Sequence, residues 1–411
     1  MKSIIFDNHD HRIKYYELML ERKSLDAIPN FPLPDGYSFE LFKPGDRDAW
    51  IDIEISAKEL TSYEQGIEVF EKYFGGKDSE LVNRMVFIKN EAGEKVATAT
   101  AYYDIYGRDK SGAGWLHWVA VRREYQGRGL AKPLISHTLR LMHSLGYAHA
   151  KIPTQTTTWL ACKIYLDFGF TPIPQNAINS LMGWRIVKTL TNHPALENFE
   201  DVSIGEILGI TWLFFDVGST LVNETEAYAH RIRDMISGTD ITFEQFQNKR
   251  IEYAKQNLRG DLEAMNYFGL TKTPWHHEDE KPYNDAEDIL KNLKKKGYKI
   301  GVIANQSLGT RDRLDNWGLM KYIDLVIASA EEGVAKPSPE IFNRALERAG
   351  CKAENAVMIG DRLDNDICPA KKLGMKTIWT KFDFSAYQTP QSPEHEADMV
   401  VDTLSDLKNV F

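Results

Sequence analysis

The sequence predicts an α/β protein built from two unlike domains. Its 411 residues are too many for one ordinary hydrophobic core, and strand patterns alternate with amphipathic helix patterns along the whole chain. A polar stretch with an acidic patch separates the two halves near residues 195–208. The strands expected after it are more uniformly apolar than those before it. We therefore expect one domain over residues 1–200 and a second over residues 201–411.

The first half has the pattern of a mixed sheet with helices. Residues 1–35 are expected to form a short helix from Lys14 to Arg22 and then an extended arm that contains several prolines. A turn signal at residues 90–93 indicates a hairpin. The expected strands are 37–42, 84–89, 95–103, 115–121 and 149–152, and the expected helices are 49–59, 63–74, 131–145 and 160–168.

The most informative stretch joins an apolar strand to a helix through a basic turn that contains two glycines. The strand ends at Val121, the turn runs from Gln126 to Ala131, and apolar residues then recur at helical spacing as far as Leu145. A glycine turn at a helix N-terminus presents free backbone N–H groups and the positive end of the helix dipole. The sequence therefore predicts a phosphate-binding turn at this point.

The spacing Gln126-x-x-Gly129-x-Ala131 resembles the acetyl-CoA pyrophosphate loop of the GNAT acetyltransferases, and Ala161-x-x-x-Tyr165-x-x-x-Gly169-Phe170 resembles their second signature. The resemblance implies the GNAT fold and acetyl-CoA as the cofactor. It implies a cofactor site that consists of Val119, Val121, Gln126, Gly127, Arg128, Gly129, Leu130 and Ala131.

The resemblance also implies two catalytic roles. Tyr165 occupies the position whose hydroxyl protonates the coenzyme A thiolate. Leu116-His117-x-x-Ala120-Val121 resembles the central strand of the arylalkylamine branch, which makes His117 a candidate base for the amine. A purely structural His117, with Glu124 or an ordered water as the base, is the alternative. A small amine is the expected acceptor, and protein N-termini remain open as an alternative.

The second half reads as a parallel sheet covered on both faces. Strands in which apolar and polar residues hardly alternate are expected at 212–216, 299–304, 324–328, 356–361 and 376–380. Helical segments separate them. Functional residues of such sheets lie at the carboxyl ends of the strands. Asp216 and Asp361 stand at two of these ends and carry most of the information in this half.

Three segments of this half resemble the haloacid dehalogenase-like (HAD) superfamily: Phe214-Phe-Asp216-Val-Gly218-Ser-Thr220, Gly333-Val-Ala-Lys336-Pro337 and Gly360-Asp361-x-x-x-x-Asp366. The resemblance implies a Rossmann-like parallel sheet and a phosphatase that uses Mg²⁺. Asp216 would be the nucleophile and a metal ligand, the Gly218 carbonyl, Asp361 and Asp366 would complete the metal site, and Lys336 would stabilise the phosphoryl charge.

Two positions depart from the phosphatase pattern. Gly218 stands where these enzymes usually carry an aspartate that acts as general acid and base. Ala304 stands near the position of a phosphate-binding Ser or Thr, so Asn305 or Ser307 would have to donate instead. The alternative hypothesis is therefore an acetyltransferase whose second domain is a slow or inactive module that binds metal and phosphate.

Residues 222–284 are expected to form a small helical cap, with helices at 224–236 and 242–258. Such a cap favours a small phosphorylated metabolite over a protein substrate. Arg231 and Arg233 are expected to be solvated rather than to bind the substrate anion, and His276 and His277 are expected at the surface of an acidic loop.

Composition narrows the remaining possibilities. The net charge of −9 argues against a nucleic-acid partner, and no apolar run approaches the roughly 18 residues of a membrane span. Three scattered cysteines without ligand spacing (Cys162, Cys351 and Cys368) indicate reduced thiols and a cytoplasmic protein. The two halves could also act in sequence on one metabolite; neither this coupling nor the oligomeric state follows from the sequence.

Overall fold

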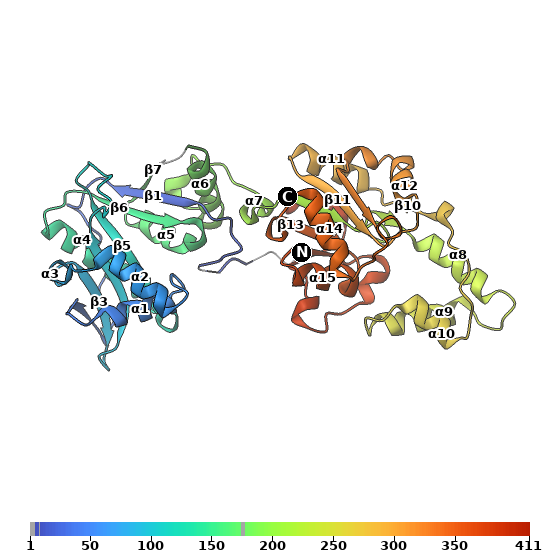
Figure 1. Cartoon of the computed structure of the whole chain (residues 1–411), viewed down its shortest axis with the longest axis horizontal. Coiled ribbons are helices and arrows are strands. Elements are labelled where there is room, and N and C mark those ends of the chain that lie inside the picture. The colour runs from blue at the N-terminus through green and yellow to red at the C-terminus, as the bar shows by residue number, and fades with distance from the viewer. Residues whose placement is uncertain (1–4, 8, 174–176) are drawn as a thin grey trace. The chain divides into compact units, whose positions relative to one another are not determined.

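A computed structural model describes residues 5–7, 9–173 and 177–411 of the chain. The fold divides into two compact units, one over residues 6–202 and the other over residues 203–411. Figure 1 labels their elements, and each unit is described separately below.

The N-terminal unit is built on a mixed sheet of seven strands in the order β2-β3-β4-β5-β6-β1-β7. All of its neighbouring strands are antiparallel except β5 and β6. The strands are β1 (Glu17–Arg22), β2 (Tyr37–Leu41), β3 (Met85–Asn90), β4 (Lys95–Tyr102), β5 (Gly114–Val121), β6 (Ala150–Gln155) and β7 (Thr171–Ile173). The helices are α1 (Arg47–Ser56), α2 (Tyr63–Phe74), α3 (Asp78–Leu81), α4 (Ala131–Ser144), α5 (Trp159–Asp167) and α6 (Ala177–Thr191).

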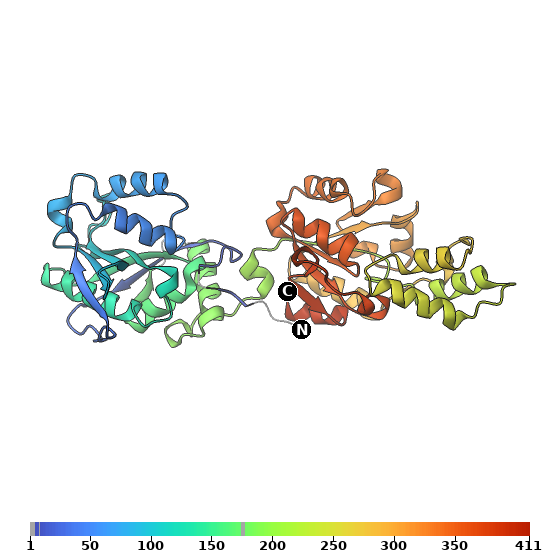
Figure 2. The ribbon, with the colours of Figure 1, turned by 90° about the horizontal axis from the view of Figure 1, so that it is seen from below.

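Helices cover both faces of this sheet (Figure 2). Successive side chains of β3 point to opposite faces of the sheet and pack against different helices. Met85 and Phe87 pack in one core cluster with α1 and α2, whereas Val86 and Ile88 pack in another with α4 and α5. This architecture confirms the predicted mixed α/β fold of the first half.

The expected helix from Lys14 to Arg22 is wrong, because this segment contains strand β1. Leu18 is paired with Thr154 of β6, and Leu20 is paired with Ile152 of β6 on one side and with Pro172 of β7 on the other. A short apolar run fits a buried strand and a buried helix equally well by its local pattern. The pairing with β6 and β7, from residues more than 120 positions away, decides the outcome.

Strands β5 and β6 separate soon after they meet. Their parallel pairing is confined to Gly114 with Ala150 and Trp115 with Lys151, although β5 continues to Val121. A register shift opposite Thr98 to Thr100 accompanies the positive φ of 51° at Trp118, which marks a bulge in β5. The backbone of β5 beyond Trp115 therefore has no strand partner on the β6 side and can bond a ligand there.

The C-terminal unit is built on a parallel sheet in the order β12-β11-β8-β13-β14-β15. Its strands are β8 (Trp212–Phe215), β11 (Lys299–Ala304), β12 (Leu325–Ala328), β13 (Ala356–Gly360), β14 (Lys376–Thr380) and β15 (Met399–Val401). Its helices include α7 (Ile204–Leu208), α11 (Ala286–Lys295), α12 (Thr310–Asn316), α13 (Ser329–Glu332), α14 (Pro339–Ala349) and α15 (Cys368–Lys372). The predicted parallel sheet is confirmed, and β15 is a strand that the sequence analysis missed.

An insert between β8 and β11 forms a helical lobe (Figure 1). A short antiparallel ribbon of β9 (Val222–Asn223) and β10 (Lys281–Pro282) closes its base. Its helices are α8 (Thr225–Ile236), α9 (Phe243–Ala254) and α10 (Gly260–Tyr267), and the third of these was not expected. A capping box between Thr242 and Gln245 starts α9, and Ile232, Phe246 and Ala264 form the small core of the lobe.

Within the described part of the chain, no helix combines the length and the apolar character that crossing a membrane requires. Cys162, Cys351 and Cys368 are all free thiols.

Candidate active sites

The acidic residues of the C-terminal unit converge where the central strands end. Asp216 directly follows β8, and Asp361 directly follows the neighbouring strand β13. Asp366 returns to them from the turn Leu363–Ile367. Carboxylate oxygens of Asp216, Asp361 and Asp366 all lie within 4.8 Å of one another. The expected cluster is therefore brought together by the carboxyl edge of the parallel sheet.

Lys336 supplies the positive charge inside this cluster. Its Nζ lies 2.8 Å from Asp216 Oδ1 and 2.6 Å from Asp366 Oδ1, and the side chain is buried. Asn305 fixes the lysine backbone: the Lys336 N–H donates to Asn305 Oδ1 at 2.7 Å, and Asn305 Nδ2 donates to the Lys336 carbonyl at 2.8 Å. These two bonds make Asn305 a positioning residue for the lysine.

The charges of the cluster do not balance. Burial raises the pKa of Asp361 well above its usual value, and the charges of Asp366 and Asp216 raise it further. Burial also raises the pKa of Asp366 to about 6, although Lys336 opposes this shift. Lys336 contacts Asp216 and Asp366, and the charge of Arg362 acts on Asp361 and Asp366, so the three carboxyl groups still outnumber the positive groups beside them. Several hard oxygen donors around such a surplus fit Mg²⁺, because this cation prefers oxygen ligands.

A fourth carboxyl group, Glu224, lies beside this cluster where the sequence has a glycine. A Cβ atom added to Gly218 would lie 2.5 Å from Glu224 Oε1. Ser219 Oγ donates to Glu224 Oε2 at 3.1 Å. Desolvation raises the pKa of Glu224 to about 8, with further contributions from the charges of Asp216 and Glu280. The sequence analysis missed Glu224; the available signal was a carboxyl group just beyond the turn that starts at Gly218.

The lobe presents a different arginine from those considered in the sequence. Arg231 donates to the Thr273 carbonyl at 2.9 Å, so it is engaged within the lobe. Arg233 lies 5.5 Å from the ring centroid of Phe243. The buried Arg250 is held between the rings of Tyr228 and Phe384, at 4.3 and 3.8 Å. Burial lowers the pKa of Arg250, and Glu224 is among the negative groups that oppose this shift.

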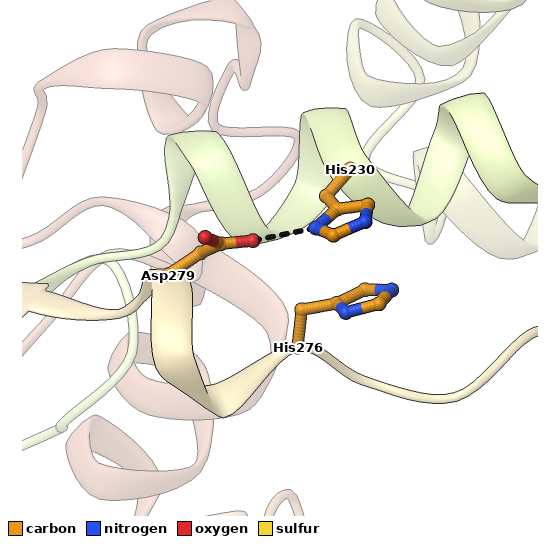
Figure 3. A group of neighbouring side chains, drawn as sticks. All are labelled: His230, His276 and Asp279. Atoms are coloured by element: carbon orange, nitrogen blue, oxygen red, sulfur yellow. Dashed lines mark hydrogen bonds and ion pairs between the residues drawn. The ribbon is translucent and has the colours of Figure 1, made fainter.

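The lobe also carries a cluster of histidines and acids at its surface (Figure 3). His230 Nδ1 lies 2.8 Å from Asp279 Oδ2, whereas His276 Nε2 lies 2.7 Å from Asp234 Oδ2. The two imidazole rings are stacked, with centroids 3.5 Å apart and an angle of 8°. Because imidazole lone pairs lie in the ring plane, stacked rings direct them along separate lines. This arrangement fits two histidine–carboxylate pairs better than one shared metal ion.

In the N-terminal unit the glycine turn leads into α4 as expected. Gly127 and Gly129 have φ values of 76° and 79°, a conformation that glycine adopts without strain, and no side chain caps the start of α4. Of the eight expected cofactor residues, all but Arg128 line a cavity of about 720 Å³. Arg128 instead donates to the Glu124 carbonyl at 2.9 Å and lies over the Tyr125 ring.

A second cavity of about 850 Å³ adjoins the first. Both cavities are lined by Glu59, Val119, Thr158, Ala161 and Tyr165, so Tyr165 stands where they meet. Desolvation raises the pKa of this buried tyrosine, which keeps its hydroxyl protonated. The carboxyl groups that line the second cavity are those of Glu17, Glu54, Glu59, Asp104 and Asp109. Its aromatic lining includes Tyr15, Tyr73, Tyr106, Trp115 and Trp118.

His117 also lines the second cavity. Its Nε2 lies 3.3 Å from the Tyr103 carbonyl, an acceptor, so we assign the ring proton to Nε2 and the lone pair to Nδ1. Burial lowers the pKa of His117 to about 4, and the imidazole is therefore neutral at pH 7.

Glu54 is the second site residue that the sequence analysis missed. It lies on α1 next to Ile53 with no exposed surface, and neither carboxyl oxygen has a hydrogen-bond partner among the described residues. Burial and the nearby charge of Glu59 raise the pKa of Glu54 well above its usual value. A carboxyl group within the apolar face of a predicted helix was the available signal. A buried acid without a partner is costly to retain in a protein interior.

Comparison with known proteins identifies both units. Residues 213–380 match the haloacid dehalogenase-like hydrolase family, and residues 48–170 match the GNAT acetyltransferase family. Glyceraldehyde 3-phosphate phosphatase of Pyrococcus furiosus is 32% identical over 223 residues, which cover 48% of this chain and 92% of that protein. The enzyme of the same name from Methanocaldococcus jannaschii is 30% identical over 225 residues, 49% of this chain and 96% of that protein.

A solved structure, a HAD phosphatase from Thermococcus onnurineus, is 24% identical, covers 48% of this chain and 96% of its own, and has a TM-score of 0.36. The chain belongs to the haloacid dehalogenase-like hydrolases through its C-terminal unit, and residues 48–170 of its N-terminal unit match the GNAT acetyltransferase family. Both are enzyme families; the first includes phosphatases that use Mg²⁺, and the second uses acetyl-CoA.

The isolation of Glu54 predicts how the stability of the N-terminal unit depends on pH. Since the folded-state pKa lies above the ordinary value of 4.5, the folded chain keeps a proton that the unfolded chain has released. Stability should therefore fall, by up to about 1.4 kcal/mol per pH unit, as the pH rises above about 4.5, until the folded-state pKa is passed. Glu54→Gln should lack this decline in urea unfolding, whereas Glu68→Gln, a change at an exposed position of α2, should retain it. Parallel pH profiles for the two variants would contradict the assignment.

Proposed function

We propose that this chain is a bifunctional enzyme. Its N-terminal unit transfers an acetyl group from acetyl-CoA to a small cationic amine, and its C-terminal unit hydrolyses a small phosphorylated metabolite with Mg²⁺. One observation in each unit carries the proposal: the unpartnered Glu54 in an acid-lined cavity, and the Asp216–Lys336–Asp366 cluster at the edge of the parallel sheet.

For the phosphatase, Asp216 is the nucleophile that attacks phosphorus. Lys336 stands between Asp216 and Asp366, so it is placed to neutralise the phosphoryl oxygens and to orient the attacking carboxylate. Asp216, Asp361, Asp366 and the Gly218 carbonyl would hold Mg²⁺, which when bound neutralises charge on the transferring group. The relatives named above act on a phosphorylated three-carbon sugar, which supports a small phosphorylated metabolite as the substrate.

For the acetyltransferase, the turn from Gln126 to Ala131 binds the pyrophosphate through backbone N–H groups at the start of α4. The acetyl group then lies near Tyr165, where the two cavities meet, and the Tyr165 hydroxyl gives its proton to the departing thiolate. The five carboxyl groups of the second cavity outnumber its two basic groups, Arg108 and Lys151, so the cavity favours an ammonium group over an anionic acceptor. Neither carboxyl oxygen of Glu54 has a hydrogen-bond partner among the described residues, so an ammonium group of the acceptor can supply one.

Two groups in that cavity can take the amine proton. His117 offers the lone pair of Nδ1, but burial lowers its pKa to about 4, which makes it a weak base. Glu54 has no hydrogen-bond partner among the described residues, and burial raises its pKa, so its carboxylate is a stronger base than that of an ordinary glutamate. We therefore assign the base to Glu54, and we assign His117 to the orientation of the acceptor.

The free cysteines and the net charge of −9 support a cytoplasmic protein that does not bind nucleic acid.

The alternative function, an acetyltransferase with an inactive second unit, is favoured by one observation: Gly218 provides no general acid at the usual position.

The acetyltransferase proposal predicts acetyl-CoA-dependent acetylation of small primary amines, measured as release of the coenzyme A thiol. Tyramine and spermidine should be better acceptors than tyrosine or glutamate, because the cavity is lined by carboxyl groups. Glu54→Gln and Tyr165→Phe should each lower kcat/KM for the preferred amine by roughly 10²–10⁴-fold, and Glu68→Gln should leave it unchanged. An acceptor profile dominated by anions, or a Glu54→Gln variant as active as Glu68→Gln, would overturn the assignment.

The phosphatase proposal predicts release of inorganic phosphate from glyceraldehyde 3-phosphate or phenyl phosphate by the full chain with Mg²⁺. EDTA should abolish this activity, and so should Asp216→Asn, because the first removes the cation and the second removes the nucleophile. Asp315→Asn, at an exposed position of α12, is the matched control. If a panel of small phosphate esters gives no turnover, the inactive-module alternative holds.

A further inference from the structure

We propose that Glu224 is the general acid and base of the C-terminal active site and acts in the space that the missing side chain of residue 218 leaves open. This inference rests on the proposed phosphatase activity. From the sequence alone, Gly218 suggests that the catalytic carboxyl group has been lost. On this proposal the group is present but is supplied by Glu224.

The geometry places the Glu224 carboxyl group where a side chain at position 218 would lie. A Cβ at Gly218 would be 2.5 Å from Glu224 Oε1 and 2.7 Å from both Oε2 and Cδ. Real Cβ atoms essentially never lie within 3.0 Å of another heavy atom, so a side chain at position 218 would require the carboxyl end of Glu224 to move. In this chain the Glu224 carboxyl group occupies the space beside Gly218.

The turn after Asp216 delivers Glu224 to this point. The Val222 N–H donates to the Val217 carbonyl at 2.9 Å, and the Ser219 N–H donates to the Val222 carbonyl at 2.7 Å, so the chain reverses tightly. Pairing of β9 with β10 then fixes the backbone just before Glu224. The residue consequently lies beside the strand end that carries Asp216, although it is eight positions further along the chain.

The Glu224 carboxyl group is not occupied by a structural role. Glu224 stands at the N-cap of α8, yet its side chain makes no capping hydrogen bond. Ser219 Oγ holds Oε2, while Oε1 has no hydrogen bond and no ion pair with any described residue. Oε1 is also the oxygen nearest to the open side of Gly218. It is therefore available to exchange a proton with a substrate.

The other ionisable groups nearby are already engaged. Lys336 Nζ is held between Asp216 and Asp366. Glu280 accepts from Trp275 Nε1 at 2.7 Å and lies 3.0 Å from His277 Nδ1. Asp361 and Asp366 belong to the metal site proposed above. Glu224 is influenced by the charge of Arg250, but it is the one carboxyl group of this set with neither an ion pair to a described residue nor a proposed metal to bind.

Hydrolysis of a phosphate ester needs a group that exchanges a proton in each of its two steps. When an Asp216 oxygen attacks phosphorus, the bond from phosphorus to the leaving oxygen breaks, and the Glu224 proton passes to that oxygen to give an alcohol. Glu224, now a carboxylate, takes a proton from water as the water oxygen attacks the same phosphorus. The bond between phosphorus and Asp216 then breaks, which yields inorganic phosphate, the free Asp216 carboxylate and protonated Glu224.

The decisive experiment compares esters with poor and good leaving groups. In the full chain with Mg²⁺, Glu224→Gln should lower kcat/KM for phenyl phosphate by at least 10²-fold but change it by less than about 10-fold for 2,4-dinitrophenyl phosphate, whose leaving group needs no proton. The variant should release one dinitrophenolate per active site in a burst and then turn over slowly, because water is no longer activated. Equal losses on both esters, or none, would overturn the role of Glu224.

A rescue variant separates catalysis from folding. Glu224→Ala should be inactive on phenyl phosphate, and the pair Glu224→Ala with Gly218→Asp should regain at least 10-fold, because φ at Gly218 lies outside the left-handed region and Glu224 no longer blocks the added side chain. The pair Glu224→Ala with Gly218→Ala is the matched control and should stay inactive. Failure of the aspartate pair to exceed this control would count against the inference.

The ester experiment also separates this inference from the phosphatase proposal. If the wild-type chain cleaves neither ester, the phosphatase proposal itself fails; if wild type and Glu224→Gln cleave both equally, only the inference fails.

Discussion

The C-terminal unit is organised around negative charge that its own residues do not neutralise. Asp216, Asp361 and Asp366 meet at one edge of a parallel sheet, and among the described residues Lys336 is the cation in ion-pair contact with this cluster. Several local features exist to keep this arrangement. Gly360 has no side chain because a Cβ there would lie 2.5 Å from Asp366 Cγ, and Asn305 holds the backbone of Lys336 from both sides. Such a surplus is stable only with a bound cation or with protons on the acids, which supports the proposed cation site at this edge.

The N-terminal unit applies the same principle with a different ligand. Strands β5 and β6 part after Trp115, and the opening leads to two adjoining cavities that meet at Tyr165. Glu54 is buried there without a hydrogen bond to any described residue. A protein that keeps an unpaired acid in its interior gives up stability, and the proposed pairing of this acid with a cationic substrate would be a physical reason to keep it. Each unit therefore indicates its ligand through the charge it leaves uncompensated.

Much of this could be predicted from the sequence, because strand ends and glycine turns are local features. The strand over residues 299–304 was predicted within its observed bounds, and Asp216 and Asp361 were predicted at strand ends. The wrong and missed predictions involve contacts between segments that are far apart in the sequence or that a tight turn brings back together. The segment over residues 17–22 became a strand because β6 and β7 flank it. Gly218 suggested a lost function because nothing in a linear pattern shows that the turn brings Glu224 back to it. Glu54 lies within an apolar helix face, and its lack of a partner is visible only in three dimensions.

The measurement that tests the central claim most directly is calorimetric titration of the full chain with Mg²⁺ in buffers of different ionisation enthalpy. Uncompensated carboxyl groups at Asp216, Asp361 and Asp366 should bind one Mg²⁺ per chain. Because burial raises the pKa values of Asp361 and Asp366, binding near pH 6 should release protons into the buffer, and Asp366→Asn should weaken it at least 10-fold. Absence of binding, or binding that Asp366→Asn leaves intact, would contradict the account of this edge as a cation site.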